Sequence, residues 1–241
     1  MKISGKFPMY KEYNPLVPVW CVTPNVGRCI HRFFDTSPFS PSMRYMAVLR
    51  MYKTDKPQPW QMIGEQLDFL VVTMKPDGSD ICTAVPLEHW RNGGHHINWH
   101  PNGKQLTMNL AIEEEHERMY FVRVDYNGEN LTKMHESLRG SGHPTLHPNG
   151  RHILTDSYEH EPVAVGDGTV PLRFIDINTG AEKTIVRVNV KNAANATYAD
   201  LRVDPHPAWA PDNRHIAFNG YVGGTRRVFV ADLGGLLKGR E

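Results

Sequence analysis

The sequence predicts an all-β protein, a β-propeller with four recognisable blades, and three observations support this fold class. First, a pattern repeats along the chain: a histidine, two residues, a large apolar residue, one residue, and then Pro-Asn or Pro-Asp. Its copies begin at His96, His143 and His206, and repetition at this scale is typical of propellers and other repeat architectures. Second, short apolar runs separated by turn-forming residues follow each copy. Third, no long stretch has the apolar spacing of a helix.

The N-terminal part is expected to be an arm, residues 1–35, that contains one valine-rich strand over residues 16–23. The first blade, approximately 36–89, opens on a weaker copy of the pattern in which Thr36 takes the place of the histidine. Its expected strands are 44–52, 68–74 and 80–85.

The three clearer copies open blades over approximately 90–138, 139–201 and 202–241. Their expected strands are 96–99, 105–110, 119–125 and 130–135; then 143–146, 152–155, 172–177 and 183–188; then 206–209, 215–218 and 227–233. Asn-Gly and Asn-Thr-Gly sequences near residues 128 and 180 predict hairpin turns. A short helical turn is expected within 191–200.

A meander of about four strands cannot bury both faces alone, and radial stacking of copies is the usual solution. Four blades leave two alternatives, a small closed ring or a partial version of a seven-bladed ring. The last blade lacks a fourth strand, which residues 16–23 could supply. We expect residues 1–241 to form a single domain, with self-association if the ring is incomplete.

Composition narrows the functional classes. The chain has 27 basic and 26 acidic residues and a net charge of +1, a balance that gives no reason to expect nucleic-acid or membrane binding. Its three cysteines lack CxxC spacing, so a disulfide framework is not expected. The polar start has no apolar segment typical of a signal peptide. These features predict a cytoplasmic protein.

The histidines of the repeat are the first candidates for chemistry. The first strand of a propeller blade lines the central channel, so His96, His143 and His206 should converge from different blades. Neutral imidazoles bind Mn, Zn, Fe or Ni, and a carboxylate such as Asp204 shifts the preference towards harder ions. The alternative is that the histidine is a repeat signature that only packs the blade.

Other residues receive predictions from strand geometry and loop position. Alternation along a strand predicts that His95 points away from His96. Structural roles are expected for the remaining repeat histidines, His100, His147, His152 and His215. Asp156 and Asp167 are expected to be loop or turn residues.

The motifs Gly-His-His-Ile-Asn-Trp-His-Pro, Gly-His-Pro-Thr-Leu-His-Pro and Asp-Pro-His-Pro-Ala-Trp resemble the oligogalacturonate-lyase group of propellers, and the Pro-Asn/Asp core resembles TolB-type repeats. The resemblance covers roughly residues 90–235. It implies a seven-bladed ring with a divalent metal, usually manganese, and β-elimination by a further histidine and an arginine. It assigns His143 and His206 to the metal and His96 to the catalytic base. Asp204 stands where the family has a second histidine.

The predicted function is therefore a metal-dependent lyase that cleaves uronic-acid-containing oligosaccharides by β-elimination, with manganese as the expected cofactor and zinc or calcium as alternatives. Arg91 is the candidate catalytic arginine and Tyr158 a candidate acid, with surface packing as the alternative for Tyr158. Basic side chains suit the recognition of a sugar carboxylate, and the candidate substrate contacts are Arg28, His31, Arg139 and Arg202. A solvated loop is the alternative for Arg28 and His31. The second functional class is a non-catalytic, TolB-like binding scaffold.

Overall fold

A computed structural model describes residues 5–25, 29–31, 33–35, 37–39, 43, 49–50, 70–75, 77, 79–90, 92–112, 118–190 and 203–238. By their contacts, the residues form two compact units. Unit 1 comprises Met1–Pro57, Leu154–Phe174 and Glu182–Glu241, and unit 2 comprises Gln58–Ile153 and Ile175–Ala181.

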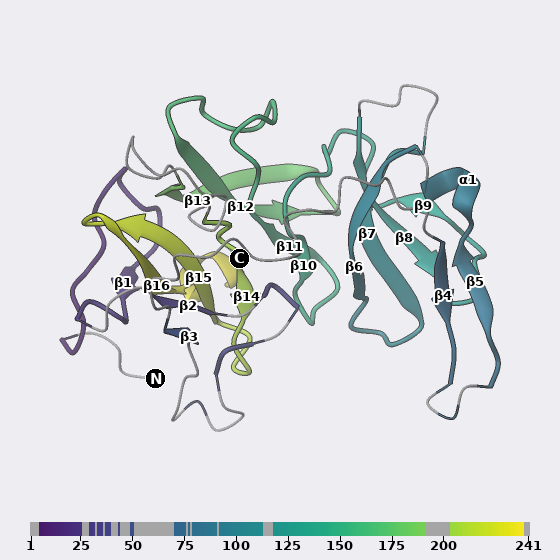
Figure 1. Cartoon of the computed structure of the whole chain (residues 1–241), viewed down its shortest axis with the longest axis horizontal. Helices are drawn as coiled ribbons and strands as arrows, with labels where there is room; N and C mark the ends of the chain where they lie inside the picture. The colour runs from purple at the N-terminus through teal and green to yellow at the C-terminus, as the bar shows by residue number, and fades with distance from the viewer. Residues whose placement is uncertain are drawn as a thin grey trace, which may run out of the picture. The chain divides into compact units, whose positions relative to one another are not determined.

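Unit 2 contains a four-stranded antiparallel sheet in the order β6-β7-β8-β9 (Figure 1). Its strands are β6 (Gly94–Trp99), β7 (Gln105–Leu110), β8 (Tyr120–Asp125) and β9 (Thr132–Lys133). A two-stranded sheet joins β4 (Val71–Thr73) to β5 (Cys82–Val85). All six strands overlap the ranges expected from the sequence.

A second four-stranded sheet has the order β10-β11-β12-β13. Its strands are β10 (Thr145–Leu146), β11 (His152–Thr155), β12 (Thr169–Asp176) and β13 (Ala181–Asn189). They again overlap the expected ranges. Strand β12 is buried at seven consecutive positions from Thr169 to Ile175, as expected for a strand covered on both faces.

Unit 1 contains the sheet β1-β16-β15-β14, formed by β1 (Val19–Cys21), β14 (Ala208–Trp209), β15 (His215–Val222) and β16 (Thr225–Asp232). Strand β1 pairs antiparallel with β16. Residues 16–23, which the sequence indicated as a possible source of the missing fourth strand, thus contain the strand that completes this four-stranded sheet. A short pair, β2 (Cys29–Ile30) with β3 (Leu49–Arg50), is also present.

Two single-turn helices, α1 (Leu87–Trp90) and α2 (Gly234–Leu237), were not expected. Four residues are too few to show a helical period, so pattern analysis cannot find them. The helical turn expected within 191–200 lies outside the described residues. None of the helices in the described ranges is long and apolar enough to cross a membrane.

The repeat is visible in the turns that follow its Pro-Asn or Pro-Asp. The side-chain oxygen of Asn102, Asn149 or Asp212 accepts hydrogen bonds from the backbone N–H groups two and three residues later. The next residue is left-handed in each case, with φ of 67° at Gly103, 69° at Gly150 and 54° at Asn213. Glycine and asparagine tolerate this conformation, which explains the residue choice at this point of the repeat.

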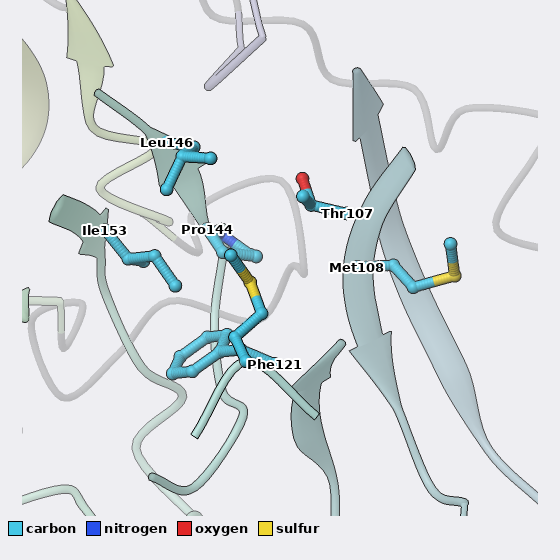
Figure 2. A pocket seen from close by; sticks show the side chains of 7 residues that line it. Thr107, Met108, Phe121, Pro144, Leu146 and Ile153 are labelled. Atoms are coloured by element: carbon cyan, nitrogen blue, oxygen red, sulfur yellow. The ribbon is translucent and has the colours of Figure 1, made fainter. Parts of the chain in front are cut away.

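Each unit has its own apolar core. In unit 2, residues from β4, β5, β7 and β8 pack together, including Val85, Leu110 and Val122. In unit 1, the core includes Leu172, Ile216 and Phe229. Figure 2 shows a small space in unit 2 bordered by Phe121, Leu146 and Ile153. Its volume is about 10 Å³, which leaves room for at most one water and is too small for a ligand.

Candidate functional site

In unit 2, His96 and His143 lie against each other. Their ring centroids are 4.0 Å apart at an interplanar angle of 38°, and His143 is only 2% exposed. His96 is left-handed, with φ of 59°, a conformation that is uncommon outside glycine and often marks a functional site. Two of the three predicted register histidines are therefore neighbours in one unit.

The prediction for His95 was wrong. The pairing of β6 with β7 shifts register between His95 and Asn98, and the left-handed His96 breaks the alternation of the strand. The His95 and His96 rings consequently meet, with centroids 4.3 Å apart and the two Nδ1 atoms 2.6 Å apart.

The neighbours of this pair fix where its protons lie. The Asn109 Nδ2 amide donates to the Gly142 carbonyl at 2.8 Å and lies 3.2 Å from His95 Nδ1, so His95 Nδ1 is an acceptor. His96 Nδ1 lies 2.6 Å from the same Gly142 carbonyl, which can only accept. His96 must therefore carry its proton on Nδ1, and a neutral His96 ring has its lone pair on Nε2.

In unit 1, Asp204 and His206 are close together in the segment before β14. Asp204 Oδ2 lies 4.0 Å from His206 Nε2. The His206 ring also packs edge-on against Phe33, with centroids 4.6 Å apart. Like His96, His206 is left-handed, with φ of 48°, and its backbone N–H donates to Asp156 Oδ2 at 3.0 Å.

Asp156 is a functional candidate that the sequence analysis missed. A loop or turn role was expected, but the side chain is 0% exposed. A buried carboxylate is costly unless it is hydrogen-bonded or faces positive charge. The residue lies 13 positions after His143.

His31 is fully buried in unit 1 rather than in an accessible loop as expected. Its backbone N–H donates to Asn219 Oδ1 at 2.8 Å. Neither ring nitrogen has a hydrogen-bond partner of good geometry among the described residues. Burial lowers the pKa of His31 to about 4, against the opposing effects of the Pro205 and His206 backbone and the Asp156 carboxylate.

A cavity of about 220 Å³ in unit 1 brings together two predicted residues, Tyr158 and Asp204. Tyr158 stacks on His160 at an interplanar angle of 11°, and its backbone N–H donates to Glu161 Oε2 at 2.9 Å. The rest of the lining combines polar and apolar residues: Ser157, Glu159, Val170, Val190 and Val203. Its volume lies somewhat below the roughly 300 Å³ at which pockets for drug-sized ligands begin, so it would suit a group the size of one sugar ring.

The predicted arginines are placed only in part. Arg139 is half-buried in unit 2. Arg28, Arg91 and Arg202 lie outside the described residues. Of the repeat histidines with expected structural roles, His100 and His147 each accept a hydrogen bond at Nδ1 from a turn N–H, and His215 Nδ1 lies 2.6 Å from Asp212 Oδ2.

No protein-family model matches the chain, and no curated protein sequence matches it significantly. Solved structures do resemble it. An oligogalacturonate lyase in complex with manganese has a TM-score of 0.55 at 18% identity, over 71% of this chain and 43% of that one. An oligogalacturonate lyase from Vibrio parahaemolyticus has a TM-score of 0.51 at 14% identity, over 68% and 42%.

TolB from Acinetobacter baumannii is also similar, with a TM-score of 0.49 at 15% identity over 90% of this chain and 41% of that one. The chain thus spans less than half of the length of each of these structures. At such identities, the likeness to the two lyases concerns the fold alone, and it supports a relationship to β-propeller folds.

Proposed function

We propose that this protein is a metal-dependent lyase that cleaves uronic-acid-containing oligosaccharides by β-elimination. The observation that carries the proposal is the pair of donors in unit 1, Asp204 and His206, whose Oδ2 and Nε2 atoms lie 4.0 Å apart. The shared repeat register makes His143 the proposed third ligand. Two imidazoles and one carboxylate form a mixed nitrogen and oxygen set that suits manganese and also accepts zinc. The similarity in fold to a manganese-bound oligogalacturonate lyase supports the same choice of metal.

The surroundings of these donors fit a cation. The Asp156 carboxyl group is fully buried and accepts the His206 N–H, so an acidic side chain lies beside one of the proposed ligands. A divalent metal bound there would supply Lewis-acid polarisation of a substrate carboxylate.

His96 is the proposed base. Its Nδ1 N–H donates to the Gly142 carbonyl. The lone pair that can accept a proton is therefore on Nε2. In the proposed reaction, His96 Nε2 takes the C5 proton of the uronate. The C5–H electrons form the C4=C5 double bond, the C4–O bond breaks, and the leaving oxygen is protonated by Tyr158 or by water.

The cavity beside Asp204 and Tyr158 is the proposed place for one sugar ring. Its valines offer an apolar floor, and Ser157, Tyr158 and His160 offer hydroxyl and aromatic groups, a combination that suits a sugar. The proposal also includes Arg139, Arg28, Arg91 and Arg202 as predicted substrate or catalytic residues. It leaves out His31, because that side chain is fully buried.

We also propose a reducing, cytoplasmic setting, in keeping with Cys21, Cys29 and Cys82, which form no disulfide. Self-association of the chain, expected if its ring is incomplete, is part of the same proposal.

The test is an activity assay on acidic oligosaccharides with added Mn²⁺. The expected product is an unsaturated uronate that absorbs in the near ultraviolet, and removal of the metal with a chelator should abolish its release. His143→Ala and His206→Ala should each lower the rate by at least about a hundredfold, while His96→Ala should remove activity and leave metal binding intact.

His100→Ala is the matched control, because His100 belongs to the same repeat but bonds only within its turn in the described contacts. It should retain metal and activity. Full activity in both His143→Ala and His206→Ala would refute the metal role. A wild-type protein that neither binds metal nor cleaves any uronate would instead support the TolB-like scaffold.

A further inference from the structure

A second polar residue follows each of the three histidines His96, His143 and His206 at the same distance. Thirteen positions later stand Asn109, Asp156 and Asn219. These three side chains are 0%, 0% and 2% exposed. Polar side chains are seldom buried this deeply without a specific hydrogen bond.

Each of these residues bonds to backbone near another histidine. Asn109 Nδ2 donates to the carbonyl of Gly142, the residue before His143, at 2.8 Å. Asp156 Oδ2 accepts the N–H of His206 at 3.0 Å. Asn219 Oδ1 accepts the N–H of His31 at 2.8 Å. The first bond lies within unit 2, and the other two lie within unit 1. Asn219 also donates through Nδ2 to the Asp204 carbonyl, near its own histidine, at 3.2 Å.

The bonded segments have unusual backbone conformations. His206 is left-handed, with φ of 48°, and Gly142 has φ of 62°. For a residue with a side chain, this conformation costs on the order of 1 kcal/mol and persists only where the surroundings enforce it. A buried hydrogen bond to that backbone holds it in this conformation, because breaking the bond would leave a buried polar group unsatisfied.

We propose that Asn109 and Asp156 are positioning residues: each holds the backbone of the next histidine in the repeat, and so orients His143 and His206 for metal binding. By the same pattern, Asn219 makes His31 the counterpart of these histidines in the N-terminal segment, where the sequence pattern had placed Thr36. The proposal rests on the proposed metal site, and it assigns the residues to positioning, not to contact with the metal.

The two positions differ in hydrogen-bond polarity, which provides a sharp test. Position 109 must donate to a carbonyl, whereas position 156 must accept from an N–H. Asn109→Asp keeps the shape and removes the donor. Asp156→Asn keeps both the shape and an acceptor oxygen. Packing alone would predict similar effects for these two isosteric exchanges.

The experiment uses the full chain and compares wild type with Asn109→Asp, Asp156→Asn and Asp156→Leu by NMR without metal. Amide exchange at His206 should stay slow in Asp156→Asn and accelerate at least about tenfold in Asp156→Leu. The carbonyl carbon shift of Gly142 should move in Asn109→Asp and remain in place in both Asp156 variants. Unchanged His206 exchange in Asp156→Leu, or an unmoved Gly142 shift in Asn109→Asp, would overturn the proposal.

A metal titration with Mn²⁺ then tests the consequence for binding. Asn109→Asp and Asp156→Leu should each weaken affinity by about 10- to 100-fold, as lost supporting contacts around metal ligands typically do. Asp156→Asn should weaken it less than Asp156→Leu, and equal losses in these two variants would contradict positioning through the hydrogen bond. If wild type binds no Mn²⁺, the proposed function fails, while the metal-free NMR result still decides whether these residues hold the histidine backbone.

Discussion

Acidification should destabilise the fold through His31. The ring is fully buried, and burial lowers its pKa from 6.5 to about 4. Between these values the unfolded chain binds a proton that the folded protein does not. Stability must therefore fall as the pH falls through this window, and it must be fully present above the unfolded pKa.

The size of the effect follows from the two pKa values. Going from about pH 7.5 to about pH 5, a group with these values removes roughly 2 kcal/mol of folding free energy. At still lower pH the loss from this residue approaches about 3 kcal/mol. Both are large fractions of the stability of a typical domain.

Urea denaturation of the chelator-treated protein at both pH values measures the effect. Other histidines also titrate, including His100 and His152, whose pKa values burial lowers. His31→Gln and His31→Leu remain neutral throughout and isolate the contribution of His31. The free energy of unfolding of wild type, relative to that of either variant, should fall by roughly 2 kcal/mol from the higher to the lower pH. A relative free energy that is the same at both pH values would refute the assignment of His31 as a buried neutral histidine.

Two further predictions concern stability. Arg173 is 1% exposed and its guanidinium donates to both carboxylate oxygens of Glu182. Glu182→Ala should cost about 3 kcal/mol in chemical denaturation, because it removes one partner of a buried charge. The matched control is Glu136→Ala, whose exposed pair with Lys133 should contribute less than about 1 kcal/mol; equal costs would contradict the argument from burial. Gly150→Ala should cost about 1 kcal/mol from its left-handed φ of 69°, since its surroundings leave room for a methyl group. Gly235→Ala, with open space and no positive φ, should change stability by less than about 0.5 kcal/mol, and a similar loss at both glycines would show that backbone conformation is not the cause.

The strands could be predicted from sequence because their signals are local. Apolar runs between turn residues located β6 to β16, and the repeat register indicated that the last sheet needed a strand from elsewhere, which β1 provides. The left-handed turn residues Gly103, Gly150 and Asn213 also depend on local sequence, because each follows the Pro-Asn or Pro-Asp of the repeat.

The site was harder to predict because its features depend on local exceptions and on long-range contacts. Strand alternation failed at His95, where a register shift and a left-handed residue bring two rings together. The residues around His31 in the sequence do not distinguish a buried histidine from an exposed one. Asp156 belongs to the 13-residue pattern, but the pattern has meaning only when the hydrogen bonds to Gly142, His206 and His31 are known.

The most direct test of the proposed function is the metal content of the purified protein and of its His143→Ala, His206→Ala and His100→Ala variants. After incubation with Mn²⁺ and removal of the excess, we expect close to one metal ion per chain in wild type and in His100→Ala, and almost none in the other two variants. Retention of the metal in both His143→Ala and His206→Ala, or the absence of bound metal in wild type, would contradict the assignment of these histidines.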